Sequence, residues 1–194
     1  MYNKSGCMLV VGITGTIGAG KGTIVEYLVK KGFTHYSVRE FLLQEIKKRN
    51  LPANRDSMVL VANDLRKNNV PSYIVDCLFE QAARCGKNAV IESIRSIGEV
   101  DSLRKKDNFV LLAVDALPQL RYKRIVERNS ETDHVSFEQF LAAEAVEFSS
   151  QDPTKQNLSQ CISMADFVIT NNDTKEDLYH KIETVIIPKL KEIN

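Results

Sequence analysis

The chain has few of the residues that mark several common classes of protein. Its 194 residues include no tryptophan, three histidines and four cysteines. The cysteines form no CxxC pair and no cluster with the histidines, so we expect no zinc site and thiols suited to a reducing cytoplasm. The sequence also lacks an apolar run of about 18 residues and an apolar leader segment. We therefore expect a cytoplasmic protein without a membrane partner.

An excess of charge of either sign is also missing. The chain carries 26 Lys and Arg against 25 Asp and Glu, a formal net charge of +1. Bulk electrostatics thus predicts no DNA or membrane-surface partner, whereas a small anion in a locally basic cleft is compatible with this balance. With 43% hydrophobic and 26% charged residues, the composition is that of an ordinary globular protein. The length predicts one domain over residues 1–194.

Short apolar segments alternate with amphipathic ones along the whole chain. Five segments are predicted as buried strands: Met8–Ile13, Phe33–Ser37, Ala89–Glu92, Phe109–Val114 and Phe167–Thr170. Helical spacing predicts helices over Thr23–Lys31, Arg39–Arg49, Arg55–Lys67, Ser72–Arg84, Pro118–Arg128, Ser136–Phe148, Thr154–Met164 and Lys175–Lys191. This order predicts an α/β protein with a parallel sheet covered on both faces. The helices at about 38–85 follow one another without a strand, which predicts an insertion over the ligand-binding edge of the sheet.

A glycine-rich loop joins the first predicted strand to the first helix. It matches G-x-x-x-x-G-K, and glycines there let backbone N–H groups approach a phosphate closely. Lys21 would reach the β- and γ-phosphates, and the Thr23 hydroxyl would lie near Mg²⁺. A glycine-rich turn with a surface lysine is the alternative, but the strand and helix on either side favour a phosphate loop for ATP. The predicted nucleotide contacts are Gly15, Thr16, Ile17, Gly18, Ala19, Gly20, Lys21, Gly22 and Thr23.

This loop resembles the G-x-x-G-x-G-K-G-T loop of adenylate kinases and related nucleoside monophosphate kinases. The hydroxyl residue follows the lysine after one glycine, unlike the general G-K-[ST] ending. The resemblance extends loosely over most of the chain and is closest to archaeal-type adenylate-kinase-related proteins, with dephospho-coenzyme A kinases more distant. It implies a three-layer P-loop kinase fold with a five-stranded parallel sheet in the order 2-3-1-4-5. ATP, Mg²⁺ and a nucleoside monophosphate are the ligands it implies.

Two further matches concern the acceptor. Val70-Pro71 resembles the pair that opens a helix in the monophosphate-binding part of that family, where it would help to form the acceptor-base pocket. A proline at an ordinary helix start explains the same residues. Glu92 and Arg95 resemble the acidic residue and arginine after the third strand. Glu92 would orient Mg²⁺ through water, and Arg95 would hold the acceptor phosphate; a solvated strand end is the alternative.

Arg124 and Arg128 resemble the Arg-x-x-x-Arg segment that leads into the lid of these kinases. Residues four apart share a helix face, so both guanidinium groups can point at one set of phosphates. Arginine suits the charge that spreads over a phosphoryl group during transfer. Because Arg121 and Lys123 are neighbours, a basic solvated face is the alternative.

The last match is the segment 168–174, which resembles the strand and turn that pack on the adenine ring. Asn172 and Thr174 would lie beside the adenine. A simple turn followed by Thr174 as a helix N-cap explains the same residues.

The family pattern fails after the second strand and in the lid. Adenylate kinases carry Thr-Gly-Asp and then Leu-Arg, whereas Leu43 stands here in place of that arginine. Ser37 and Arg39 are the predicted acceptor contacts, and Arg39 or Arg55 would have to replace the missing cation. The lid at about 129–150 is short, residues 136–150 contain no arginine, and Lys155 is a late positive charge.

Three functions are compatible with these residues. The first is phosphoryl transfer from ATP to a ribo- or deoxyribonucleoside monophosphate, with Lys21, Arg95, Arg124 and Arg128 carrying the chemistry. The second is a dephospho-coenzyme A kinase-like activity on a hydroxyl, which usually needs a base. Arg39-Glu40 stands where those kinases carry an aspartate, and this favours a phosphate acceptor. The third is a nucleotide-sensing module or slow ATPase that acts on an RNA or protein partner.

Overall fold

A computed structural model describes residues 8–128, 135–148 and 156–193. Cys7, Lys155 and the first part of the predicted lid, 129–134, lie outside these ranges, as does Ser149–Ser150 at its end. The described elements are β1 (Val10–Gly15), α1 (Lys21–Lys30), β2 (Thr34–Ser37), α2 (Val38–Lys48), α3 (Arg55–Asn68), α4 (Tyr73–Cys85), β3 (Ala89–Glu92), α5 (Ile97–Arg104), β4 (Phe109–Asp115), α6 (Pro118–Arg128), α7 (Phe137–Phe148), α8 (Leu158–Ser163), β5 (Phe167–Thr170) and α9 (Lys175–Ile193).

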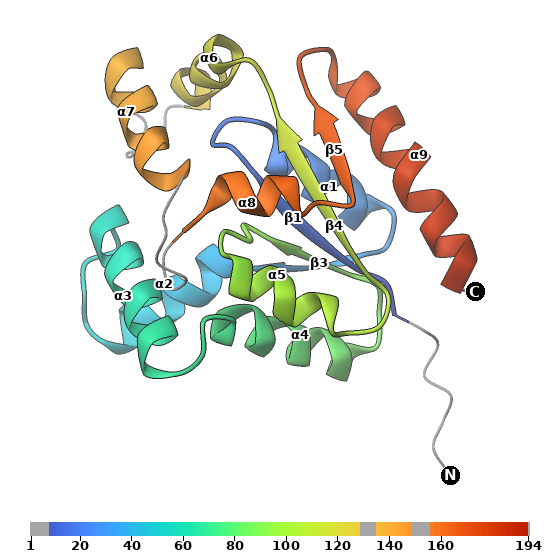
Figure 1. Cartoon of the computed structure of the whole chain (residues 1–194), viewed down its shortest axis with the longest axis horizontal. Coiled ribbons are helices and arrows are strands. Elements are labelled where there is room, and N and C mark those ends of the chain that lie inside the picture. Colours follow the sequence, from blue (N-terminus) through green and yellow to red (C-terminus); the bar gives the residue numbers. More distant parts are fainter. Residues whose placement is uncertain (1–7, 129–134, 149–155, 194) are drawn as a thin grey trace.

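The strands form one parallel sheet in the order β2-β3-β1-β4-β5 (Figure 1). All residues of β1 are buried, because β1 lies in the middle of the sheet and has helices on both faces. This position explains the continuous apolar run, which is typical of a parallel strand covered on both sides. The predicted α/β class and strand order are confirmed.

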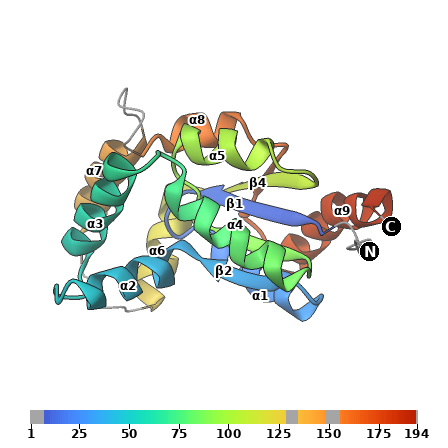
Figure 2. The ribbon, with the colours of Figure 1, turned by 90° about the horizontal axis from the view of Figure 1, so that it is seen from below.

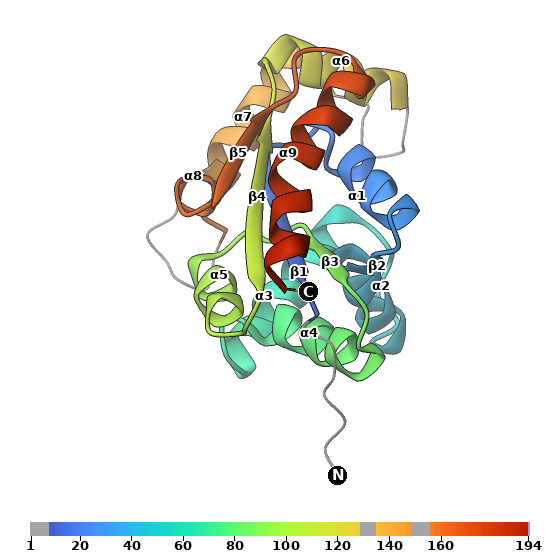
Figure 3. The same cartoon turned by 90° about the vertical axis from the view of Figure 1, so that its right-hand side faces the viewer.

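Successive side chains of β1 enter different cores. Val10 packs with residues of α4 and α5, whereas Val11 packs with residues of α1 and α9. This alternation follows from the period of two in a strand. Figure 3 shows α9 running along the strands on the side of the sheet that α1 also covers. No helix in the described ranges is long and apolar enough to cross a membrane.

The carboxyl ends of the strands point toward the side of the molecule where α2, α3, α6 and α7 lie (Figure 2). Of the three helices between β2 and β3, α4 packs against these strands and α2 packs against α3. The phosphate loop and the starts of α2 and α6 follow strands at this same edge. Segments from most of the chain therefore meet where ligands bind in open parallel sheets.

One helix was not predicted from the periodicity. α5 lies between β3 and β4 and has only eight residues. It begins with a capping box, in which the Ser96 hydroxyl accepts from Glu99 N and the Glu99 carboxylate accepts from Ser96 N. This Ser-x-x-Glu pattern is the local signal for the helix start. At α8 the reverse holds: the described helix starts after the Asn157 cap and is shorter than the predicted Thr154–Met164.

Candidate functional site

The phosphate loop connects β1 to α1, as predicted. Gly18 and Gly20 have φ angles of 76° and 106°, in the left-handed region. A Cβ atom at Gly18 would lie 2.5 Å from the Arg121 carbonyl oxygen, and one at Gly20 would lie 2.4 Å from Asn171 Nδ2. Both the backbone angle and the lack of space therefore require glycine. The residues that face the loop, Arg121 and Asn171, come from distant parts of the sequence.

Lys21 and Thr23 lie in the first turn of α1. Lys21 Nζ donates to the carbonyl oxygens of Gly15 and Thr16, each at 2.8 Å, so the ammonium is held against the loop. The Thr23 side chain is partly exposed. Gly20, the N-cap of α1, has no side chain to satisfy the first N–H groups of the helix. A helix start of this kind attracts anions.

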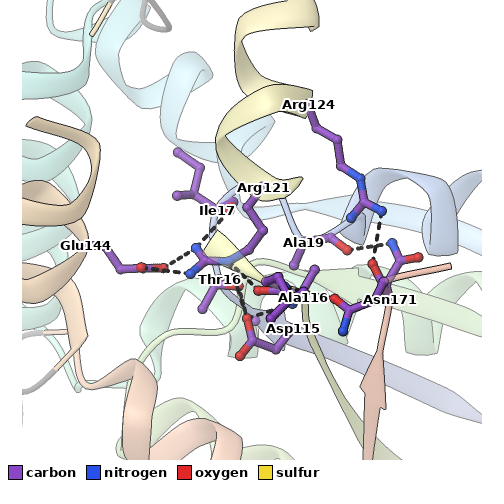
Figure 4. A network of polar contacts seen from close by, with 12 residues as sticks. Thr16, Ile17, Ala19, Asp115, Ala116, Arg121, Arg124, Glu144 and Asn171 are labelled. Carbon is purple, nitrogen blue, oxygen red and sulfur yellow. Dashed lines mark hydrogen bonds and ion pairs between the residues drawn. The ribbon is translucent and has the colours of Figure 1, made fainter. Parts of the chain in front are cut away.

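Asp115, at the end of β4, ties the loop to the sheet. Its Oδ1 accepts from Thr16 Oγ1 at 2.5 Å and from Ala116 N at 2.8 Å. The Thr16 side chain is buried. The carboxylate thus fixes both the start of the loop and the chain that leads into α6 (Figure 4).

Arg121 of α6 is 3% exposed and makes contacts with three segments. Its guanidinium donates to Ala116 O at 2.8 Å, to Ile17 O at 3.3 Å and, through two nitrogens, to the Glu144 carboxylate of α7. The interpretation of this helix as a basic solvated face is therefore wrong for Arg121, although Lys123 is exposed. Arg121 lies four residues before the buried Ile125, and this spacing is the signal that places it on the inner face.

Arg124 lies one turn further along α6 and points toward Asn171 (Figure 4). Its Nη2 donates to Asn171 O at 3.0 Å, whereas its Nη1 is buried and has no hydrogen-bond partner. Arg128 is exposed at the end of the helix. An arginine nitrogen that is buried without an acceptor is costly and calls for an anion or a water molecule.

The turn after β5 contributes a residue that sequence reasoning did not single out. Asn171 is 7% exposed, and its Nδ2 donates to Ala19 O of the loop at 2.8 Å. The predicted Asn172 instead accepts from Leu117 N at 2.9 Å. Thr174 accepts from Asp177 N at 3.2 Å and caps the start of α9, as the alternative reading of this turn predicted. The adenine role of Asn172 and Thr174 stays a prediction.

Glu92 lies where β2 and β3 end. Its Oε1 accepts from Ser37 Oγ at 3.0 Å and its Oε2 from Ser93 Oγ at 2.6 Å. Val90, two residues earlier, packs in the core on the α1 side, so Glu92 points to the face covered by α1, which carries Thr23 in its first turn. Ser37 also accepts from Glu40 N at 3.2 Å and so caps α2. His35 Nε2 lies 4.0 Å from Glu92 Oε1 and has no hydrogen-bond partner.

Hydrogen bonds hold both the main chain and the side chain of Arg95. Its N–H donates to Glu99 Oε2 at 2.8 Å, its carbonyl oxygen accepts from Asn157 N at 2.8 Å, and its Nη1 donates to Gln156 at 3.0 Å. The other Glu99 oxygen pairs with Arg66 of α3 at 2.8 Å, and both charged residues are almost fully buried. This ion pair joins the helical insertion to the segment that carries Arg95. Neither Arg66 nor Glu99 was predicted.

The remaining acceptor candidates lie on the insertion. Pro71 packs against α5, where its Cβ lies 2.7 Å from the position of a Cβ at Gly98. Val70 is 51% exposed and Arg39 is exposed. Arg55 starts α3. Hydrogen bonds thus link the loop to Asp115, Arg121 and Asn171, and Asn171 to Arg124. Glu99 links Arg95 to the insertion. Among the residues that the structure describes, no hydrogen bond joins Arg39 to either group.

Strand order, loop and helices on both faces define the P-loop kinase fold, and solved structures of this fold resemble the chain. TT1252 from Thermus thermophilus superposes with a TM-score of 0.64 at 20% identity, covering 93% of this chain and 97% of that one. Shikimate kinase from Bacteroides thetaiotaomicron superposes with a TM-score of 0.56 at 10% identity, covering 93% and 99%. The predicted resemblance to P-loop kinases is confirmed for the fold.

The chain belongs to the AAA domain family, whose model matches residues 11–147, from β1 into α7. A UPF0200 protein of Methanocaldococcus jannaschii is 29% identical over 182 residues, which are 92% of this chain and 89% of that relative. Together, the fold and the loop are those of a P-loop protein with a kinase-like fold.

Proposed function

We propose that this protein transfers the terminal phosphate of ATP to a small phosphorylated acceptor, with a ribo- or deoxyribonucleoside monophosphate as the first choice. The observation that carries the proposal is Arg124 Nη1, a buried cationic donor without an acceptor beside the phosphate loop. A phosphate oxygen is the acceptor that arginine matches best in charge and geometry.

The loop supplies the donor side. Gly18 and Gly20 carry no side chains that would keep a phosphate away from the loop amides. Lys21 lies against the loop, from where its flexible chain can swing toward the β- and γ-phosphates. Arg124, and Arg128 one turn away, would neutralise the charge that develops on the transferring group.

Oxygen ligands for Mg²⁺ are present on the same side. Thr23 offers a partly exposed hydroxyl and Glu92 a carboxylate, the kind of donor that Mg²⁺ prefers. Mg²⁺ supplies neutralisation of the β- and γ-phosphate oxygens when it is bound. Ser37 and Ser93 donate to Glu92 and keep the carboxylate oriented.

Arg95 would hold the acceptor phosphate. Its main chain is fixed on both sides by Glu99 and Asn157, so only the side chain has to adapt. A phosphate acceptor is already ionised and needs no base. Val70 and Pro71 would contact the acceptor base, and Val70 has the exposed apolar surface for this.

The test is a coupled assay with Mg-ATP across all ribo- and deoxyribonucleoside monophosphates, with dephospho-coenzyme A in the same panel. We expect turnover of at least one monophosphate and an about 10²- to 10³-fold lower kcat/KM for Lys21→Ala. Lys30→Ala removes an exposed charge from the same helix and serves as the matched control.

The outcomes separate the alternatives. Turnover of dephospho-coenzyme A alone would replace the monophosphate with a hydroxyl acceptor. ATP binding without turnover of any acceptor would contradict the kinase proposal and favour a nucleotide-sensing module for an RNA or protein partner.

A further inference from the structure

Two carbonyl oxygens of the phosphate loop accept hydrogen bonds from buried side chains outside it. Ile17 O accepts from Arg121 of α6 at 3.3 Å, and Ala19 O accepts from Asn171 after β5 at 2.8 Å. These two side chains come from opposite sides of the loop's middle, and they are 3% and 7% exposed (Figure 4). Protein groups alone make both bonds.

Because the peptide group is planar, these two hydrogen bonds also fix the direction in which the next N–H groups of the loop point. In a trans peptide the C=O of one residue and the N–H of the next point in opposite directions, and the described chain has no cis peptide. A bond from Arg121 to Ile17 O therefore turns Gly18 N–H away from Arg121. In the same way, the bond from Asn171 to Ala19 O turns Gly20 N–H away from Asn171.

Packing supports the same arrangement independently. The Arg121 carbonyl oxygen occupies the space that a side chain at Gly18 would need, and Asn171 Nδ2 occupies that space at Gly20. The loop thus lies directly on these two residues. A shift of either one would move the peptide planes that it contacts.

The positive charge of Arg121 is already compensated by carboxylates, so this residue is not suited to bind a phosphate. Its two terminal nitrogens are paired with Glu144, its Nε lies 3.6 Å from Asp115 Oδ1, and its Cζ lies 5.4 Å from the centroid of the Phe140 ring. Arg124, in contrast, has a buried nitrogen without a partner. Asn171 is neutral. Arg121 and Asn171 are therefore suited to hold the loop backbone and not to bind the nucleotide.

We propose that Arg121 and Asn171 are positioning residues that preorganise the phosphate loop, and that Glu144 of α7 keeps Arg121 in that position. This inference rests on the proposed binding of nucleotide phosphates by the loop. Donors that are oriented in advance need no reorganisation when the anion arrives, so affinity for phosphates rises without any contact between these residues and the ligand. Through Glu144, the loop also depends on the position of α7.

The experiment is calorimetric titration with ADP and with pyrophosphate, at a temperature where circular dichroism shows each variant to be folded. Glu144→Gln keeps the shape of the side chain but weakens its hold on Arg121. Asn171→Leu keeps a similar size but removes the donor to Ala19 O. We expect each variant to bind both probes about tenfold more weakly than the wild type, the effect of one lost hydrogen bond.

Glu127→Gln is the charge-matched control, because Glu127 is exposed on α6 and its side chain is 63% accessible. It removes the same charge as Glu144→Gln and should leave both affinities unchanged. If Asn171→Leu does not fold, the isosteric Glu144→Gln carries the test alone.

Three results would overturn the inference. Wild-type affinity in folded Glu144→Gln and Asn171→Leu, with only the melting temperature lowered, would reduce both residues to a structural role. Tighter pyrophosphate binding by Glu144→Gln would identify Arg121 as a phosphate ligand restrained by Glu144. A wild-type protein that binds neither probe would remove the nucleotide site itself, which is the failure of the proposed function and not of the positioning alone.

Discussion

Gly18 and Gly22 stand four residues apart, but only one of them has room for a methyl group. A Cβ at Gly18 would meet the Arg121 carbonyl at 2.5 Å, whereas a Cβ at Gly22 meets nothing within 4 Å. Gly18 also has a positive φ, while Gly22 lies in the first turn of α1. The motif has glycine at both positions, but only Gly18 is required by backbone angle and space.

We expect Gly18→Ala to lower the free energy of unfolding by at least about 1–2 kcal/mol, the cost of a left-handed residue with a Cβ. Gly22→Ala should raise it by up to about 1 kcal/mol, because alanine is the better helix former. Urea unfolding followed by circular dichroism measures both, since the chain has no tryptophan for fluorescence. Equal stability of the two variants would contradict this account of the loop.

The composition of the chain does not tell which cysteine thiols are reactive, and Cys161 of α8 is an example. Its side chain is fully buried, and burial raises the pKa of the thiol to about 12, with the Glu99 carboxylate acting in the same direction. The thiolate is the reactive form, so it is scarce at neutral pH. Cys85, by comparison, is exposed.

Maleimide labelling of the folded protein at pH 8 should therefore modify Cys85 and leave Cys161 unmodified until denaturant is added. Peptide mass analysis after labelling is the measurement, and rapid labelling of Cys161 in the folded protein would contradict the burial.

The raised pKa of Cys161 also means that the folded state keeps a proton that the unfolded state loses as the pH rises above about 9. The free energy of unfolding should accordingly fall between that pH and about 12.

The helix α5 was not predicted from the spacing of apolar residues, and its polar side chains explain why. It has eight residues, and three of them are buried: Glu99, Val100 and Leu103. Because a charged residue occupies one of these inner positions, the helix does not show a clean apolar stripe. The Ser96–Glu99 capping box was the available signal, but the partner of Glu99, Arg66, is 33 residues away in the sequence.

Removal of one member of this buried pair leaves an uncompensated charge. We expect Glu99→Leu and Arg66→Leu each to lower the free energy of unfolding by about 3–5 kcal/mol. The double variant should lose much less than the sum, because no charge is then left unpaired. A double-mutant cycle from urea unfolding tests this, and strict additivity would show that the two residues do not interact.

At the scale of the whole molecule, the site combines segments that are far apart in the sequence. The loop contacts α6 through Arg121 and the turn after β5 through Asn171, and α7 joins through Glu144. A ligand in the loop would therefore stabilise contacts throughout the sheet edge. Ligands that bind only the folded state raise its apparent stability by mass action.

ATP at about 100 times its Kd should add about 2.7 kcal/mol, which corresponds to about 5–11 °C in Tm for a chain of this size. Adenosine, which lacks phosphates, should have little effect, and Lys21→Ala should reduce the effect of ATP. Thermal denaturation with each ligand measures this. An equal shift with adenosine and ATP would place the main binding energy outside the phosphate loop.

Local physics was enough to predict most of the frame from the sequence. Apolar runs of strand length, helical spacing between them and glycines before Lys21 depend on neighbours along the chain, so they predicted the sheet, its helices and the loop. The loop resemblance then supplied the strand order, which the structure confirmed. The roles of Lys21, Thr23, Glu92, Arg95, Arg124 and Arg128 stay predictions.

Tertiary structure decided which polar side chains are buried and what they hold. Arg121 and Lys123 look alike in the sequence, as do Asn171 and Asn172, but Arg121 and Asn171 are buried and bond to the phosphate loop. The same is true of Arg66 and Glu99. Burial and pairing depend on segments that meet only after folding, and no pattern of neighbouring residues contains that information.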